Sequence, residues 1–180
     1  GLGVCYQDEQ PPHPADYIAE LREHLSDRDL TLVLEPGRSI AANAGVLLTR
    51  VQYLKPGQEK NFAIVDGAMN DMIRPALYQA WLNIEPVTPR LGVASKWDIV
   101  GPVCETGDFL GKDRNMVIAQ DDLLCIGSSG AYGFTMSSNY NSRGRAAEIM
   151  VDGDKIYEIR KRETFDDLIR GESLLPDEAE

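Results

Sequence analysis

The spacing of chain-breaking residues after Gly45 constrains the fold more than any other feature of this sequence. Five segments rich in β-forming residues follow between 46 and 162, each soon interrupted by proline, glycine or aspartate: VLLTRVQYL, NFAIVDG, WDIVGPVC, DLLCIG and AEIMVDGDKIYEIRKR. Short segments with such breaks are typical of strands. No helix longer than a few turns is indicated there, so residues 46–180 are predicted to form an antiparallel Greek-key β barrel or sandwich.

The end of this predicted domain carries two local signals. Asp152-Gly153 lies between two β-rich arms, which is a strong hairpin pattern. Thr164 precedes the segment FDDLIR and is a good helix N-cap. We therefore expect a hairpin around 152–153, then a short helix, then a frayed acidic tail.

Residues 1–45 have a different character. PADYIAELREHL places its apolar residues on one helical face, and the run LTLVL at 30–34 resembles a strand buried on both faces of a parallel sheet. A helix followed by a buried strand is half of a βαβ unit. One such unit cannot close a parallel layer, so we expect a mixed α/β and β chain that is the C-terminal piece of something larger.

Composition excludes several classes of function. The net charge of −11 leaves no basic surface for nucleic acid or anionic membranes. Three cysteines form neither a CxxC pattern nor a disulfide framework, and two histidines are too few for a zinc site, so no metal is predicted. No apolar run approaches the ~20 residues of a membrane span. These features indicate a cytoplasmic protein with reduced thiols.

Several motifs could bind a ligand. The segments GLGV (1–4) and LEPGRSI (34–40) offer glycines and an arginine of the kind that phosphate groups need. By itself, GLG is more often an ordinary turn, and EPGR is as often a tight strand exit with a surface arginine. In DGAMNDMIRPALY, Arg74 and Tyr78 are four residues apart and would share a helical face if the helix begins at Arg74, because Pro75 follows directly. The alternative is a core-plugging loop with a solvated arginine.

GPVCETGD (101–108) and the polar loop around Tyr132 are the other candidates. A partly exposed Cys104 thiol could deliver a proton, and the neighbouring Glu105 could hold an ammonium group. Isolated cysteines are more often buried small hydrophobes, and from the residues alone that alternative stays open. The loop SSGAYGFTMSSNYNSRGR is long and rich in glycine, as functional loops and plain Ω-loops both are.

Taken in order, GLGV, EPGRSI, DGAMNDMIRPALY, GPVCETGD and GAYGFTMSSNYNSR resemble the C-terminal half of the diaminopimelate decarboxylase family. That family depends on pyridoxal 5'-phosphate and shares its group with ornithine and arginine decarboxylases. The resemblance runs from residue 1 to about 170. It implies that residues 1–45 are the C-terminal slice of a TIM (β/α)8 barrel and that residues 46–180 are the β domain.

The resemblance also implies roles for individual residues. Cys104 matches the position that protonates the carbanion left when CO2 departs, acting from the partner subunit of a homodimer with a shared active site. Cofactor contacts are implied for Gly1, Glu35, Pro36, Gly37, Arg38 and Tyr132. Substrate contacts are implied for Arg38, Arg74, Tyr78, Glu105 and Tyr132.

The expected substrate is meso-2,6-diaminopimelate, converted to L-lysine and CO2. Its distal end carries a carboxylate and an ammonium, which Arg38 or Arg74 and Glu105 would bind respectively. None of the chain's six lysines lies in the context where the family places its aldimine lysine, so the chain alone is expected to be inactive. The alternatives are another basic amino-acid decarboxylase of the group and a non-catalytic dimerisation module.

Overall fold

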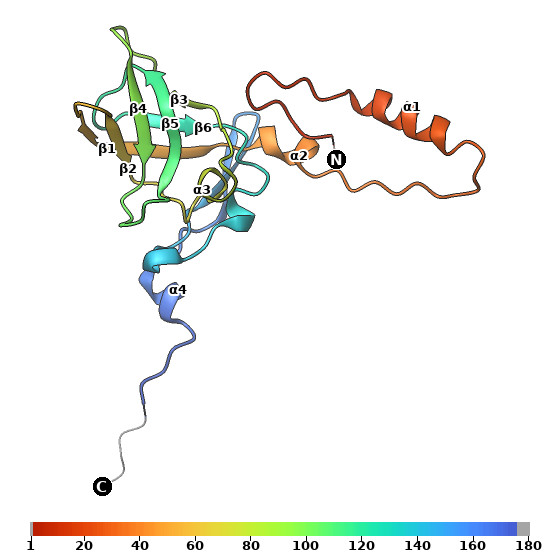
Figure 1. The fold of residues 1–180 in the computed structure, drawn as a ribbon. Coiled ribbons are helices and arrows are strands. Elements are labelled where there is room, and N and C mark those ends of the chain that lie inside the picture. Colours follow the sequence, from red (N-terminus) through yellow and green to blue (C-terminus); the bar gives the residue numbers. More distant parts are fainter. Residues whose placement is uncertain (1, 176–180) are drawn as a thin grey trace.

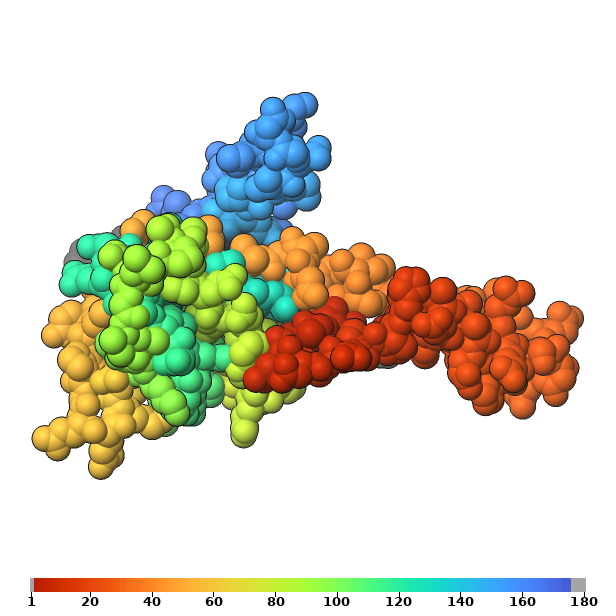
Figure 2. All heavy atoms as spheres, turned by 90° about the horizontal axis from the view of Figure 1, so that it is seen from above, coloured from red at the N-terminus to blue at the C-terminus, as the bar shows by residue number. Residues whose placement is uncertain are grey.

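The computed structural model describes residues 2–175, which form a β-rich body and an arm that projects from it (Figure 1). The arm runs from residue 2 to about 37 and carries the helix α1 (Pro14–His24). Figure 2 shows most of this arm, in red and orange, extending away from the body. The two predicted parts of the chain are therefore visibly different in packing.

In the arm, the predicted helix is confirmed, whereas the predicted strand does not form in the described part of this chain. Helix α1 begins where His13 accepts a hydrogen bond from the Ala15 amide and Pro14 occupies the first turn. Residues 30–34 form no strand, and Leu30 and Val33 are 64% and 76% exposed. A strand exists only through hydrogen bonds to a neighbouring strand. The described part of this chain offers residues 30–34 no such neighbour.

The body is built on one six-stranded sheet in the order β3-β6-β1-β2-β4-β5. Its strands are β1 (Leu47–Lys55), β2 (Phe62–Val65), β3 (Ile84–Pro86), β4 (Ser95–Val100), β5 (Phe109–Met116) and β6 (Leu123–Ile126). Pairings are antiparallel except between β2 and β4, which run parallel. The purely antiparallel sheet predicted from the sequence is therefore wrong at this one pairing, which joins strands separated by a long connection.

The two end strands of the sheet, β3 and β5, approach each other, so the sheet is nearly barrel-like. Gly111 lies at this approach: a Cβ added there would be 2.7 Å from Ile84 Cδ1 and 2.7 Å from Arg114 Nε. A larger residue at 111 would require the Ile84 and Arg114 side chains to move. Strand β5 was not among the predicted segments, because its sequence FLGKDRNM is dominated by polar residues.

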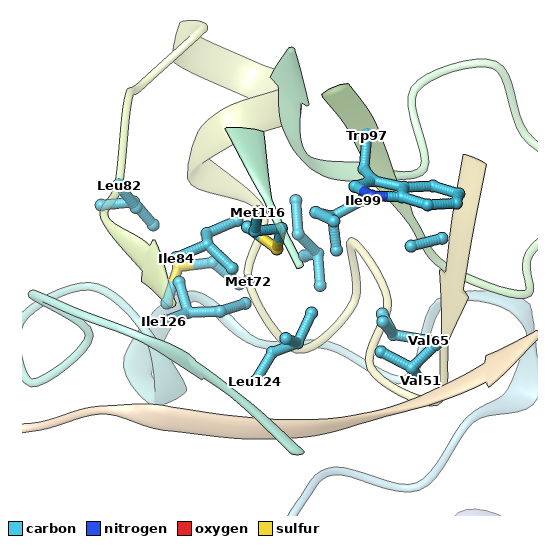
Figure 3. Close-up of a cluster of buried hydrophobic side chains, with 12 residues drawn as sticks. Val51, Val65, Met72, Leu82, Ile84, Trp97, Ile99, Met116, Leu124 and Ile126 are labelled. Carbon is cyan, nitrogen blue, oxygen red and sulfur yellow. The ribbon is translucent and has the colours of Figure 1, made fainter. Parts of the chain in front are cut away.

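The core lies inside this curved sheet (Figure 3). Alternate residues of the strands point inward, as the period of a strand requires. Val51 and Val65 face each other from paired β1 and β2, and Ile99 lies on β4. The remaining large members are Met72, Leu82, Ile84, Trp97, Leu110, Met116, Leu124 and Ile126.

A separate ribbon and a short helix follow the sheet. The ribbon pairs β7 (Glu148–Asp152) with β8 (Lys155–Arg160), and Gly153 turns between them at φ +61°, which confirms the predicted hairpin. Helix α4 (Phe165–Ile169) starts at Thr164, whose hydroxyl and amide both bond the Asp167 carboxylate in a capping box, so the predicted cap is confirmed. Residues 176–180 lie outside the described part.

Short helical turns connect these elements and carry much of the polar surface. They are α2 (Arg38–Ala41), η1 (Ala42–Ala44), α3 (Arg74–Tyr78), η2 (Phe134–Met136) and η3 (Tyr140–Ser142). Across residues 2–175, no helix has the length and apolar character needed to cross a bilayer. Over the same range, no three metal-ligating side chains of the His, Cys, Asp and Glu types gather together.

Candidate active site

Two arginines distant in sequence meet where the arm joins the body. Arg74 is the first residue of α3, so Pro75 lies in the first turn, where its missing N–H costs nothing. Arg38 is the first residue of α2. The condition set by the sequence, that a helix must begin at Arg74, is therefore met.

The hydroxyl of Tyr6 joins these two arginines. Arg74 Nη1 donates to it at 2.8 Å and Arg38 Nη1 at 3.4 Å, and both guanidiniums also lie against the Tyr6 ring, 5.5 and 5.9 Å from its centre. Burial favours a higher pKa for the Tyr6 hydroxyl, but the hydrogen bonds and charges of the two arginines outweigh it and lower the pKa. The pair is thus an anion-attracting site that a carboxylate would fit.

Tyr132 completes this cluster. Its backbone lies in the left-handed region at φ +62°, and its ring centre is 5.8 Å from the Arg74 guanidinium carbon. A Cβ added to Gly37 would lie 3.4 Å from the Tyr132 hydroxyl oxygen, so the absence of a side chain at Gly37 keeps this hydroxyl close to the backbone. The structure therefore brings Gly37, Arg38, Arg74 and Tyr132 together, with Tyr6 among them.

Cys104 and Glu105 form a second group, on the loop between β4 and β5. Both side chains are exposed, whereas Val103 before them is buried. The Glu105 carboxylate accepts hydrogen bonds from the Gly107 amide at 3.1 Å and from the Tyr140 hydroxyl at 3.3 Å. The negative charge of Glu105 raises the pKa of the Tyr140 hydroxyl. Because Cys104 is exposed, the buried-filler alternative is wrong for this chain.

The polar loop that carries Tyr132 and Tyr140 is fixed to the body by buried polar contacts. Asn70 is 1% exposed, donates to the Ser138 carbonyl and accepts from Arg143 Nε at 2.9 Å. Arg143 also donates to the Asp66 carbonyl. These contacts give a glycine-rich segment a defined position, which a ligand-binding loop needs.

The other predicted positions lie in and around these two groups. Tyr78 is on α3 but is 61% exposed and makes no side-chain hydrogen bond within the described residues. Glu35 and Pro36 are exposed in the segment before Gly37. Gly1 lies outside the described residues. Across residues 2–175, no recorded hydrogen bond or ring contact joins the arginine cluster to the Cys104 and Glu105 loop.

Sequence reasoning missed three residues that shape the site. Tyr6 is 32 residues from Arg38 and 68 from Arg74, so no local spacing relates it to them. Tyr140 lies in a loop already regarded as a functional candidate, but nothing in the sequence pairs it with Glu105. Asp108 ends the candidate segment GPVCETGD and was assigned no role of its own, yet it is 4% exposed and accepts two backbone hydrogen bonds.

The class of protein that the structure defines is a nearly closed β domain with arginines, tyrosines and an exposed thiol on its connecting segments. The family described as "Pyridoxal-dependent decarboxylase, C-terminal sheet domain" matches residues 6–130. The chain belongs to this family.

Individual relatives agree with this assignment. The chain is 65% identical over 176 residues to a diaminopimelate decarboxylase of Pseudomonas aeruginosa, covering 98% of this chain and 42% of that protein. It is 61% identical to the Vibrio cholerae diaminopimelate decarboxylase, with 98% and 43% covered. The chain thus spans less than half the length of the curated relatives it matches.

Solved structures give the same result. The diaminopimelate decarboxylase of Helicobacter pylori, complexed with L-lysine, superposes with a TM-score of 0.88 at 44% identity, over 94% of this chain and 42% of that one. The enzyme from M. jannaschii superposes with a TM-score of 0.90 at 37% identity, over 98% and 42%. These likenesses include the arm as well as the β body.

Proposed function

We propose that this chain supplies the C-terminal part of a pyridoxal-phosphate-dependent decarboxylase that converts meso-2,6-diaminopimelate to L-lysine and CO2. The observation that carries the proposal is the meeting of Arg38 and Arg74 at one hydroxyl, 3.4 and 2.8 Å away. Two guanidiniums at one point suit a carboxylate, and diaminopimelate keeps one at its distal end throughout the reaction. Relatives at 61% and 65% identity carry the name of this enzyme.

Part of the cofactor's surroundings fits residues of this chain. The turn Glu35–Arg38 and the Tyr132 hydroxyl beside Gly37 offer backbone and hydroxyl donors for its polar groups. When bound, pyridoxal phosphate supplies the electron sink that accepts the electron pair released with CO2. Within the described residues, none of the six lysines contacts this cluster in a recorded hydrogen bond or ion pair. The chain alone is therefore proposed to be inactive.

The second group has the chemistry for the remaining step. The exposed Cys104 thiol would donate its proton to the substrate carbon that has lost its carboxylate. Glu105 would hold the distal ammonium, since it is an exposed carboxylate on the same loop. Because no recorded hydrogen bond or ring contact in residues 2–175 joins this loop to the arginine cluster, we assign them to different sites of a homodimer, with Cys104 acting in the partner subunit's site.

Residues 1–45 are proposed to be the last slice of a TIM barrel. The exposed apolar run at 30–34 supports this, because barrel neighbours would cover it and pair its backbone. All three cysteines are free, which supports a reducing cytoplasmic setting. Amide exchange tests the barrel assignment: residues 30–34 should exchange rapidly in the chain alone and slowly when the remainder of the barrel is attached.

One joined protein tests the function. It consists of the part of the P. aeruginosa relative that precedes its matched region, followed by residues 1–180. Release of CO2 should be fast with diaminopimelate and at least about a hundredfold slower with ornithine, arginine or carboxynorspermidine. Preference for one of the latter would indicate another decarboxylase of the group, and no turnover by the folded joined protein would indicate a non-catalytic module.

Two variants complete the test. The Cys104→Ala joined protein should bind diaminopimelate with little change in KM but lose about a hundredfold or more in kcat, because it lacks the proton donor. Unchanged turnover would remove Cys104 from the mechanism. The 180-residue chain with added cofactor should release no CO2, and measurable release would overturn the proposed inactivity.

A further inference from the structure

The geometry points to Asp108 as a positioning residue that clamps the Cys104 and Glu105 loop to the segment leading into Arg74. This inference rests on the proposed function, because it concerns how the proton donor and the substrate arginine are held in one domain. Asp108 follows Cys104 by four residues and is not itself exposed to a ligand. Its two carboxylate oxygens each accept a hydrogen bond from a different segment of the backbone.

On one side, the Asp108 carboxylate closes the loop that carries the thiol. Its Oδ2 accepts from the Val103 amide at 2.7 Å, directly before Cys104. The loop ends are also joined in the backbone, where the Gly101 amide donates to the Asp108 carbonyl at 3.1 Å. A Cβ added at Gly101 would lie 2.3 Å from Asp108 Oδ2, so only glycine leaves room for this carboxylate.

On the other side, Oδ1 of Asp108 accepts from the Met69 amide, also at 2.7 Å. Met69 belongs to a tight turn in which the Met72 amide donates to the Ala68 carbonyl, and the Met72 side chain is only 1% exposed. This turn leads directly into Arg74 at the start of α3. Asp108 therefore holds the backbone at Met69, and through this turn it restricts where Arg74 lies.

The charge of Asp108 explains why this contact is strong. A buried carboxylate that accepts two short backbone hydrogen bonds is held more tightly than a neutral acceptor would be. No ion pair to Asp108 is recorded in residues 2–175, so the two amides are its principal partners. In a dimer with shared sites, the Cys104 of one domain and its Arg74 serve different sites, and Asp108 fixes the distance between the two contributions.

Asp108→Asn in the joined protein tests this inference. Asparagine keeps the size but offers one acceptor oxygen, and its NH2 group would face one of the two amide donors. We expect kcat to fall at least about tenfold while KM changes less than about threefold. The solvent deuterium isotope effect on kcat should increase, because proton delivery from a misplaced Cys104 becomes slower.

Asp98→Asn is the matched control. Asp98 is also buried, at 7% exposed, and also accepts from a backbone amide, that of Asp113 at 2.8 Å. Its other oxygen accepts from Lys60 Nζ at 2.9 Å, and no recorded hydrogen bond in residues 2–175 joins the Asp98 side chain to residues 101–108. This variant should lose stability without a change in kcat or in the isotope effect. An equal loss of kcat in both variants would overturn the positioning role.

A second measurement does not depend on decarboxylation. In the 180-residue chain, amide hydrogen exchange at Val103 and Met69 should be at least about tenfold faster in Asp108→Asn and unchanged in Asp98→Asn. If Asp108→Asn fails to fold, Gly101→Ala disturbs the same clamp from the opposite side and should have the same effects. Unchanged exchange at both amides would overturn the clamp.

The outcomes separate this inference from the proposed function. Faster amide exchange with unchanged kcat and isotope effect would overturn the catalytic role of the clamp and leave the decarboxylase proposal intact. A folded but inactive wild-type joined protein would overturn the proposed function and, with it, the catalytic part of the inference. Amide exchange would still decide whether Asp108 holds the loop.

Discussion

The apolar run at residues 30–34 and the apolar run of β6 (Leu123–Ile126) have similar side chains and opposite surroundings. Val33 in the first run is 76% exposed, whereas Leu124 in the second is fully buried between β1 and β3. Strand β6 has a partner on each side, and the run in the arm has none in residues 2–175. An apolar run therefore becomes a strand only when neighbours pair its backbone and cover its faces.

The largest expected effect comes from truncating one side chain in each run. Leu124→Ala should lower the free energy of unfolding by about 2–5 kcal/mol, because it leaves a cavity in a closed core. Val33→Ala should change it by less than about 0.5 kcal/mol, because solvent already surrounds that side chain. Urea denaturation of the 180-residue chain measures both. A comparable loss in the two variants would mean that the arm packs as tightly as the body.

The second effect concerns stability at low pH, to which we expect Glu163 to contribute. Its carboxylate accepts from Arg145 Nε at 2.8 Å, from the Arg145 amide and from Asn139, and the bonds to Arg145 above all lower its pKa to about 2. A carboxylate whose pKa is lower in the folded state stabilises the fold, and this stabilisation is fully present above the usual pKa of 4.5. That stabilisation is lost as the pH falls from about 4.5 towards 2.

Thermal unfolding between pH 7 and pH 2 tests this expectation. The wild-type Tm should fall through the range from 4.5 to 2, and Glu163→Gln should begin with a lower Tm and fall less steeply. The control is Glu158→Gln on the exposed ribbon, which should keep the wild-type profile. Parallel profiles for wild type and Glu163→Gln would exclude Glu163 as the titrating group.

The body was largely predictable because its signals are local. Strands β1, β2, β4 and β6, the β7–β8 hairpin and the Thr164 cap all follow from short patterns of apolar and breaking residues. Strand β5 was not, because Lys112 and Arg114 look solvated in the sequence. In the structure Lys112 is exposed over the ring of Phe109 in the same strand, but Arg114 is 8% exposed and packs on the ring of Trp81, and the backbone pairs with β4. Tertiary contacts therefore override the local preference there.

The candidate site likewise has features that could be predicted from the sequence and features that could not. Arg74 at a helix start, and Cys104 in a glycine-bounded loop, could be proposed from the sequence. The contact of Tyr6 with both arginines could not, since it joins residues 32 and 68 positions apart. The parallel pairing of β2 with β4 has the same cause. Contacts between distant segments leave no periodic signal in a single sequence.

A third effect concerns how the arm is attached to the body. Tyr6 lies in the arm and its hydroxyl bonds Arg74 in the body, so Tyr6→Phe removes a recorded link between the two regions. Limited proteolysis of the arm should become several-fold faster, because the arm opens more often. Tyr17→Phe on α1, whose hydroxyl makes no recorded hydrogen bond in residues 2–175, should leave the rate unchanged. Equal rates in wild type and Tyr6→Phe would show that other contacts hold the arm.

The smallest effects are opposite pKa shifts of two tyrosines, one in each region. Arginines lower the pKa of Tyr6 in the arm, and the charge of Glu105 raises the pKa of Tyr140 in the body. Arg74→Ala should therefore raise the pKa of Tyr6, and Glu105→Gln should lower that of Tyr140. Each variant serves as the control for the other, because neither removes the other tyrosine's partner.

NMR titration of chains carrying labelled tyrosine rings measures both values in one experiment. The Tyr6 shift also reports whether the two arginines stay together, because Arg38 alone would still lower its pKa in part. If Arg74→Ala leaves Tyr6 unchanged, then the phenol is not held between the guanidiniums in solution, and the proposed carboxylate site loses its main support. A rise in the Tyr6 pKa would show that Arg74 contacts this phenol in solution, at the point where the substrate carboxylate is proposed to bind.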